Sequence, residues 1–288
     1  MVRPYAVKGK KRKKTHDSSS SSSYKAEQQF EPEDEQLLHQ QLQQEPQEEQ
    51  IDEENEKIAH EAAENLPGIP ITTTDVKHKG GGVIFILEKA SLEVAKVGKS
   101  YQILTSDDHA NFIRKNKRDP ADYRPDIAHQ ALLAILDSPL NKAGKLRAVY
   151  VRTEKGVLFE VLPHVRIPRT PKRFYGIMLQ LLQKLSITAT NKREKLLRVI
   201  KHPVTQHLPI NSRKIGLSHS SDKLVKLPDY VAAANDDETL VFVVGAMSHG
   251  KIDQEYTDDF ISVSDYPLSA ANCISRICYS LELKWNIV

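Results

Sequence analysis

Three arginines gather in a short stretch of the sequence, residues 164–174, where they could bind phosphate groups. Arg166, Arg169 and Arg173 fall within eight consecutive residues. Guanidinium groups bind phosphate oxygens through paired hydrogen bonds, so clusters of them are typical of proteins that hold a nucleic-acid backbone. The alternative is a solvated basic loop whose arginines make scattered surface ion pairs.

Two prolines limit how this stretch can be presented. Pro168 and Pro171 cannot both lie inside one continuous helix, so the first two arginines are predicted on an extended segment that leads into a helix beginning near Pro171. Thr170 is the expected N-cap. The free N–H groups of the first helical turn would then point toward the same anion as the arginines.

A glycine loop directly follows a predicted strand further along the chain. The strand, Leu240–Val244, is apolar throughout, and Gly245 and Gly250 come after it. Because glycine lets the backbone turn sharply and approach a ligand closely, residues 243–250 are a candidate cofactor loop. The loop matches neither the dinucleotide fingerprint nor a P-loop, and an ordinary glycine turn is the alternative.

A second candidate loop, Ser262–Ala271, is rich in hydroxyl and free backbone groups. Ser264 or Asp265 is expected to cap the helix that follows, with Pro267 in its first turn. Core packing explains the apolar stripe of that helix, residues 267–283. It does not explain the loop, which is therefore a candidate binding element.

An acid and an arginine lie two residues apart just before another predicted helix, residues 127–136. Asp126 is expected to cap that helix and to orient Arg124. Simple capping beside a surface arginine is the alternative. His129 on the same helix is expected to be a structural histidine.

The other reactive side chains do not predict a metal site or a nucleophile. The eleven histidines lack metal-ligand spacing, and Cys273 and Cys278 fall five residues apart in one predicted helix, where their side chains diverge. Neither a zinc site nor a disulfide is expected. No Ser-His-Asp or Cys-His arrangement stands out.

The first third of the chain has a biased composition. Six of the seven residues from Lys8 to Lys14 are basic, which fits a nuclear-import signal or an RNA-binding arm, and residues 31–64 hold thirteen acids against one lysine. Such a segment buries too little apolar surface to offset its ordering entropy, so residues 1–78 are predicted to be a disordered tail. Since the whole chain carries a net charge of +3, the remainder is distinctly basic, which indicates an anionic partner.

Residues 79–288 carry the patterns of one α/β domain. The apolar run Val83–Leu87 is typical of a buried central strand, and residues 148–153 and 157–161 flank a turn as a hairpin. Helical periodicity appears in residues 127–136, 172–185, 193–200 and 267–283. Strands that alternate with helices indicate an α/β fold. Since no apolar run reaches spanning length and no signal peptide is visible, a soluble intracellular protein is expected.

Five motifs, in order over residues 80–288, closely resemble those of the nucleolar essential protein family. They are Arg124-Pro-Asp-Ile-Ala-His-Gln130, Asp137-Ser-Pro-Leu-Asn-Lys-Ala-Gly144, Val165-Arg-Ile-Pro-Arg-Thr170, Val243-Val-Gly-Ala-Met-Ser-His-Gly-Lys251 and Ser264-Asp-Tyr-Pro-Leu-Ser-Ala-Ala271. Members of this family are pseudouridine-N1-specific methyltransferases of small-subunit rRNA. The family belongs to the SPOUT class, so the resemblance implies an α/β domain at 79–288 with a C-terminal deep trefoil knot, preceded by the disordered tail.

The resemblance also implies roles for individual residues. S-adenosyl-L-methionine is the implied cofactor, held by Leu217, Gly245, Gly250, Lys251, Ile252, Val263, Ser264, Asp265, Tyr266, Pro267 and Leu268. RNA contacts are implied for Arg124, Arg166, Arg169 and Arg173, with Asp126 holding an arginine in place. No residue identifies itself as the catalytic base, and no metal is implied.

The function implied by the resemblance is methylation of N1 of one pseudouridine in 18S-type, small-subunit rRNA. The expected enzyme is a nuclear, nucleolar homodimer that works with pre-ribosomal assembly proteins and without a membrane. The alternative is an RNA-binding assembly factor that keeps the fold but whose essential role is non-catalytic. Both functions need the arginines, and only the first needs an intact methyl-donor site.

Overall fold

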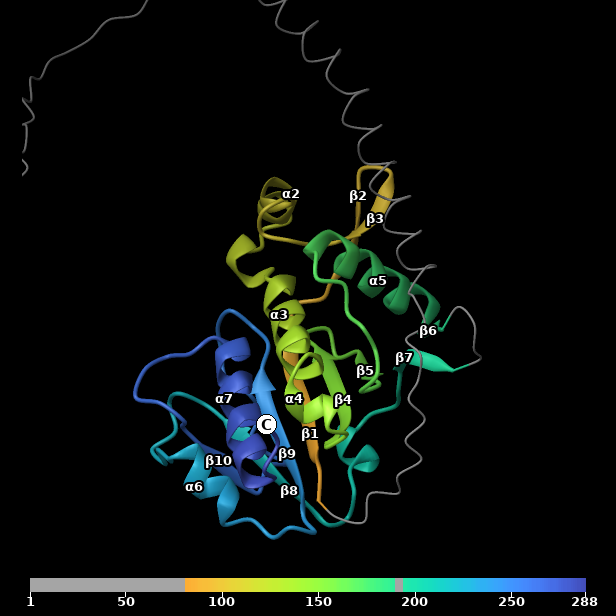
Figure 1. Cartoon of the computed structure of the whole chain (residues 1–288). Helices are drawn as coiled ribbons and strands as arrows, with labels where there is room; N and C mark the ends of the chain where they lie inside the picture. Colours follow the sequence, from red (N-terminus) through yellow and green to blue (C-terminus); the bar gives the residue numbers. More distant parts are fainter. Residues whose placement is uncertain (1–80, 190–193) are drawn as a thin grey trace, which may run out of the picture. The chain divides into compact units, whose positions relative to one another are not determined.

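A computed structural model describes residues 81–189 and 194–288 of the chain. Their centre is an eight-stranded mixed sheet with the strand order β10-β8-β9-β1-β4-β5-β7-β6 (Figure 1). The tail predicted at residues 1–78 lies outside the described residues, so its disorder stays a prediction.

Five neighbouring strands of the sheet are parallel to one another. Its strands are β10 (Asp259–Ile261), β8 (Ser212–Leu217), β9 (Thr239–Gly245), β1 (Val83–Ala90) and β4 (Leu146–Thr153). In the central strands, Val83–Leu87 of β1 and Leu240–Val244 of β9 are apolar and buried on both faces, as parallel strands covered on both sides must be. This confirms the strands predicted from their continuous apolar runs.

The remaining three strands are joined by antiparallel pairing. The strand β5 (Leu158–Val161) pairs with β4 as the predicted hairpin, and β7 (Lys195–Val199) and β6 (Ser186–Thr188) extend the edge. The helix predicted at residues 193–200 is wrong, since β7 occupies that stretch. Leu197 is fully buried, and its strand pairs with β5 on one side and β6 on the other. A short apolar run such as that in β7 is compatible with a strand or a helix, and here the pairing with the neighbouring strands determines that it is a strand.

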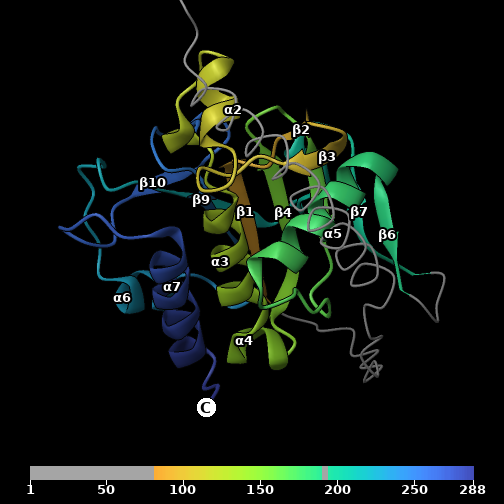
Figure 2. The same ribbon diagram turned by 90° about the horizontal axis from the view of Figure 1, so that it is seen from above.

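Helices cover one face of the sheet. They are α3 (Pro125–Leu136), α4 (Pro139–Lys142), α5 (Pro171–Lys184), α6 (Leu227–Ala232) and α7 (Ala270–Lys284). Figure 2 shows α3, α5 and α7 on the same side of β1 and β4, and their apolar side chains share one core with Phe85 and Leu87 of β1. On the opposite face, the 3₁₀ turn η2 (Val204–His207) and Ile252 pack against the alternate side chains of β1.

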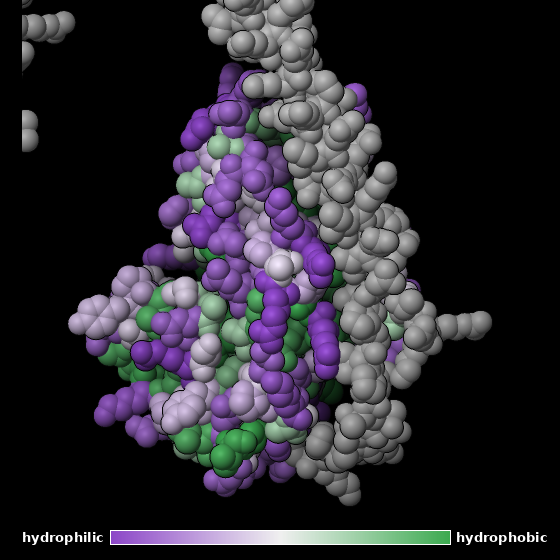
Figure 3. All heavy atoms as spheres, turned by 45° about the horizontal axis from the view of Figure 1, so that its top comes forward, coloured by the Kyte–Doolittle hydropathy of each residue, from purple (hydrophilic) through white to green (hydrophobic). Residues whose placement is uncertain are grey.

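A small insert lies between β1 and α3. It consists of β2 (Val94–Val97), β3 (Ser100–Ile103), α2 (Ala110–Lys115) and the 3₁₀ turn η1 (Pro120–Asp122). Its own small core is formed by Leu104, Ile113 and Tyr123, and β3 packs against α5. The side chains over this end of the sheet are mostly hydrophilic (Figure 3). No pattern in the sequence predicted the insert.

The helix starts differ in detail from the predictions. Thr170 is the N-cap residue of α5, as predicted, although its side chain accepts no hydrogen bond there. Asp126 does not cap α3, because Arg124 holds the N-cap position and Asp126 lies in the first turn. The predicted caps of α7 are also wrong: Ser269 accepts a hydrogen bond from Asn272 N, so Pro267 precedes the helix.

The cysteines and the helices add little further chemistry. Cys273 and Cys278 are buried free thiols. The part of the chain that the structure describes has no group of three or more His, Cys, Asp or Glu placed to hold a metal ion. None of its helices combines the length and apolar character needed to cross a membrane.

Candidate functional site

A cavity of about 830 Å³ opens at the carboxyl ends of β8, β9 and β10. The last residues of these strands, Leu217, Gly245 and Ile261, all line it. In parallel sheets this edge is the usual ligand site, because the loops after neighbouring strands meet there. The volume falls within the range of roughly 300–1,000 Å³ that is typical of small-molecule sites.

The cavity brings together nearly all of the predicted donor-site residues. Those that line it are Leu217, Gly245, Gly250, Lys251, Ile252, Val263, Ser264, Tyr266 and Leu268. Asp265 and Pro267 belong to the same loop but are exposed outside the lining. The three segments are separated in sequence and are united only by the adjacency of β8, β9 and β10 in the sheet.

Some lining residues were not predicted from the sequence. Ser218–Ser220 follow β8, Ser106 and Ala121 come from the insert, and Cys273 comes from the first turns of α7. A hydroxyl-rich run after a predicted strand could have indicated the serines. Nothing local marks Ser106 or Ala121.

The two glycines of the loop after β9 have different reasons to be glycine. A Cβ on Gly245 would come within 2.8 Å of Met247 Cε and 2.9 Å of its Sδ, so the glycine makes room for that side chain at the cavity wall. Gly250 has a φ of +104°, a region that L side chains rarely adopt, and nothing crowds it.

The loop after β9 is fastened to the end of β1. Ala246 N donates to Glu88 O at 2.8 Å, and the Tyr256 hydroxyl donates to Glu88 Oε1 at 2.6 Å. Lys89 Nζ donates to Lys251 O at 2.7 Å. Glu88 is only 1% exposed, so this part of the cavity wall is tied to a buried strand at several points.

The loop before α7 is braced by its own hydroxyls and by a neighbouring loop. Ser262 Oγ donates to Ser264 O at 2.9 Å, and Tyr266 N donates to Ser264 Oγ at 3.0 Å. Val225 N donates to Ser262 O at 2.9 Å, which holds the chain after β8 against the chain after β10. The backbone of this wall is therefore set before any ligand enters.

Arg124 lines the same cavity and is held by Asp126. Its Nε donates to Asp126 Oδ1 at 2.8 Å and its Nη2 to Oδ2 at 2.7 Å. These hydrogen bonds lower the pKa of Asp126 and raise that of Arg124, so both groups stay charged. The expected contact between Asp126 and Arg124 is present, and its role in RNA binding stays a prediction.

The other three arginines lie on a neighbouring segment. Arg166, Arg169 and Arg173 are exposed, and Arg166 lies between the buried side chains of Val165 and Ile167. Arg169 Nη2 lies 3.1 Å from Asp137 Oδ2, but it is 80% exposed, so this ion pair contributes little stability. Charges held this way remain available to an anionic partner.

The cavity is built for binding and alignment. Its walls combine apolar side chains with serine hydroxyls and backbone groups, and no Asp or Glu is among the residues that line it. Burial raises the pKa of Cys273 to about 11, so this lining thiol is a poor nucleophile at neutral pH. The site suits a reactant that arrives already activated.

Five parallel strands whose ends enclose a cavity, with arginines beside it, define an α/β protein whose geometry suits a small organic ligand next to an anionic macromolecule. The sequence model described as "EMG1/NEP1 methyltransferase" matches residues 85–282. The chain therefore belongs to this methyltransferase family, which confirms the resemblance drawn from the five motifs.

Curated relatives agree with this assignment. The chain is 52% identical to the ribosomal RNA small subunit methyltransferase nep-1 of Caenorhabditis elegans over 203 residues, which cover 70% of this chain and 87% of that protein. It is 47% identical to the ribosomal RNA small subunit methyltransferase NEP1 of Homo sapiens over 209 residues, or 73% of this chain and 84% of that protein.

A solved structure supports the fold. Archaeoglobus fulgidus Nep1, crystallised with S-adenosylhomocysteine, superimposes with a TM-score of 0.54 at 20% sequence identity, covering 71% of this chain and 99% of that chain. At this identity the likeness concerns the fold alone. It agrees with the α/β architecture predicted from the sequence.

Proposed function

We propose that this chain transfers a methyl group from S-adenosyl-L-methionine to N1 of a pseudouridine in small-subunit rRNA. Family membership makes it a methyltransferase with S-adenosylmethionine as its cofactor, and its curated relatives are named ribosomal RNA small subunit methyltransferases. The choice of pseudouridine N1 rests on the resemblance of the five motifs to a family with that specificity.

One observation carries the proposal: Arg124 lines the same cavity as the glycine loop and the loop before α7. Donor-binding loops and an arginine suited to RNA thus meet in one space. The exposed arginines of the segment before α5 extend this basic surface, which supports an RNA substrate over a small-molecule one.

The main contribution of the protein to this reaction is to align the methyl donor with the RNA base. S-adenosylmethionine supplies a methyl group already activated on a sulfonium. A bond forms between N1 and the methyl carbon as the carbon–sulfur bond breaks, S-adenosylhomocysteine leaves, and the N1 proton passes to water. The braced loops around Gly245 and Ser264 would hold the donor, and Arg124, fixed by Asp126, would hold the RNA beside it.

Several finer features belong to the same proposal. We infer a C-terminal trefoil knot, supported by the contact of the chain after β8 with the chain after β10. A homodimer is supported by the exposed apolar side chains Tyr279 and Leu283 on α7. Action in the nucleolus during ribosome assembly, with pre-ribosomal assembly proteins, follows from the proposed substrate.

The decisive test is methyl transfer from labelled S-adenosylmethionine to two RNA stem-loops that differ only in carrying pseudouridine or uridine. We expect label in the pseudouridine RNA alone. Binding of both RNAs without transfer to either would favour the alternative, a non-catalytic assembly factor.

A further inference from the structure

We propose that Asn141 and His129 are positioning residues that hold the arginine segment, residues 163–170, in the conformation that binds RNA. The inference rests on the proposed function, because it assigns these residues to the RNA-binding part of that activity. Neither side chain reaches the cavity at the strand ends.

The arginine segment has little backbone pairing of its own. It runs from the end of β5 to the start of α5. Within the described chain, Val165 N donates to Leu162 O at 3.1 Å, and no other backbone amide of residues 163–169 donates to a backbone group. A stretch without a strand partner keeps one conformation only if side chains hold it.

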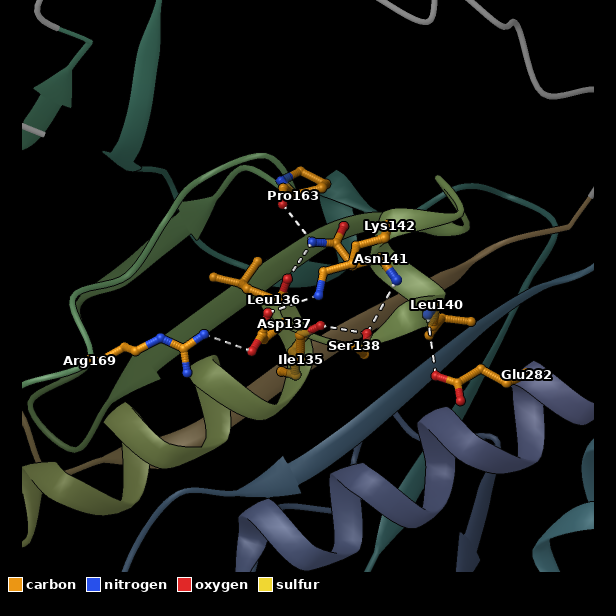
Figure 4. A network of polar contacts seen from close by, with 10 residues as sticks. All are labelled: Ile135, Leu136, Asp137, Ser138, Leu140, Asn141, Lys142, Pro163, Arg169 and Glu282. Atoms are coloured by element: carbon orange, nitrogen blue, oxygen red, sulfur yellow. Dashed lines mark hydrogen bonds and ion pairs between the residues drawn. The ribbon is translucent and has the colours of Figure 1, made fainter. Parts of the chain in front are cut away.

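Asn141 holds the beginning of the segment. Its Nδ2 group donates to Leu136 O at 2.9 Å and to Pro163 O at 2.8 Å, so both amide hydrogens are used (Figure 4). One carbonyl ends α3 and the other starts the arginine segment. A single side chain therefore fixes the segment to the corner between α3 and α4.

That corner is itself rigid. Ser138 Oγ donates to Ile135 O at 2.7 Å and accepts from Asn141 N at 3.2 Å, which caps α4. Leu140 N donates to Glu282 Oε1 on α7 at 3.2 Å (Figure 4). Asn141 is thus anchored to two helices before it reaches the segment.

His129 holds the other end of the segment. Its Nε2 lies 2.7 Å from Pro168 O, and because a carbonyl only accepts, Nε2 carries the hydrogen. The ring is 3% exposed and stacks on Phe174 of α5, with ring centroids 4.5 Å apart. The histidine predicted to be structural therefore ties α3 to the last part of the segment.

The two anchors explain how the arginines are displayed. Between Pro163 and Pro168, Val165 and Ile167 turn into the core while Arg166 turns out. Arg169 follows directly after the second anchor. Restraint of both ends lowers the conformational entropy that RNA binding would otherwise have to remove.

The test uses full-length protein with the variants Asn141→Leu, which keeps the approximate shape without a donor, and His129→Phe, which keeps a ring against Phe174 without its N–H. We expect Asn141→Leu to raise the KM for RNA about tenfold and His129→Phe about fivefold, since two and one hydrogen bonds are lost. The kcat at saturating RNA and the Kd for S-adenosylmethionine should stay unchanged. Hydrogen exchange of the Val165 amide, which donates to Leu162 O, should accelerate.

The matched control is Asn116→Leu at the C-cap of α2, because Asn116 Nδ2 donates to Phe112 O at 2.8 Å, away from the arginine segment. It should leave the RNA KM unchanged. If Asn141→Leu leaves the RNA KM unchanged, as the control should, and changes only the melting temperature, the positioning role is refuted. If reversing the three arginines has no effect on RNA binding, the positioning role is also refuted, because the segment then does not bind RNA. If wild-type protein does not bind the stem-loop at all, the proposed function fails instead.

Discussion

Removing the hydroxyl of Tyr256 should loosen the wall of the donor cavity. This hydroxyl donates to Glu88 Oε1 at 2.6 Å and is a direct tie between the end of the loop after β9 and strand β1. Burial, and then the charge of Glu88, raise the pKa of Tyr256, so the phenol keeps its proton and donates throughout the neutral range. Tyr256→Phe deletes this bond and little else.

The magnitude follows from the surroundings of Glu88. Its carboxylate is 1% exposed, its Oε2 has no hydrogen-bond partner in the described structure, and Arg152 Nη1 lies 3.5 Å from it. A hydrogen bond to a buried charged group contributes about 1.5–3 kcal/mol, so we expect Tyr256→Phe to lower the free energy of unfolding by about 2 kcal/mol. For a domain of this size that corresponds to a fall in Tm of about 4–8 °C.

Two assays separate stability from function. Urea unfolding measures the free energy of unfolding, and calorimetry measures the affinity for S-adenosylmethionine, which should fall about three- to tenfold because the loop that carries Gly250 to Ile252 loses a tie. The control is Tyr150→Phe. That hydroxyl donates to the neutral His207 O at 3.2 Å in η2, which is not part of the loop after β9, so its loss should cost no more than about 1 kcal/mol and leave donor affinity unchanged.

The reasoning is refuted if both tyrosine variants lose the same stability and neither changes donor affinity. Glu88 would then be adequately held by Arg152. The loop after β9 would be kept in place by its packing instead.

Four further predictions follow from the site. Replacement of Arg166, Arg169 and Arg173 by glutamate should flatten the slope of log RNA affinity against log salt by about two units without changing donor affinity. An unchanged slope would mean that the three arginines only belong to a solvated surface loop. Gly245→Val should weaken calorimetric binding of S-adenosylmethionine, because a Cβ there comes within 2.8 Å of Met247 Cε and displaces this side chain at the cavity wall. Wild-type affinity would move the donor site elsewhere. Asp126→Asn should weaken RNA binding severalfold, because Arg124 loses its charged partner. If a filter-binding assay gave the same RNA affinity for Asp126→Asn and wild type, the role of Asp126 would be restricted to helix stability. Partial desolvation raises the pKa of Asp259, but hydrogen bonds from Lys223 and Tyr230 outweigh this effect and lower the pKa from 3.8 to about 2. The stabilisation by Asp259 is therefore complete above pH 3.8 and is lost toward pH 2. The difference in unfolding free energy between wild type and Asp259→Asn should narrow over that range, and a constant difference would contradict this.

Local patterns determined much of the architecture. The apolar runs of β1 and β9, the hairpin of β4 and β5, and the stripes of α3 and α5 were predicted correctly, because each depends on side chains a few residues apart. The contact between Arg124 and Asp126 was predictable for the same reason, since two residues separate them along the chain. The five motifs likewise indicated the family before the fold was known.

Tertiary structure decided the details where local signals were ambiguous. Residues 195–199 form a strand because β5 and β6 lie on either side of them, and α7 starts at Ala270 because the preceding residues bend around Ser264 to line the cavity. Proline and serine favour a helix start, but they do not fix which of several neighbouring turns begins it.

The cavity itself could not be read from the chain. Leu217, Gly245 and Ile261 meet only because β8, β9 and β10 are neighbours in the sheet, and Asn141 reaches Pro163 only because the arginine segment folds back on the corner after α3. These contacts join residues tens of positions apart, and their geometry follows from the order of parallel strands and the burial of one common core. The sequence by itself determined which residues could bind a donor and RNA, and the sheet determined that they meet, because strand order depends on the packing of the whole domain.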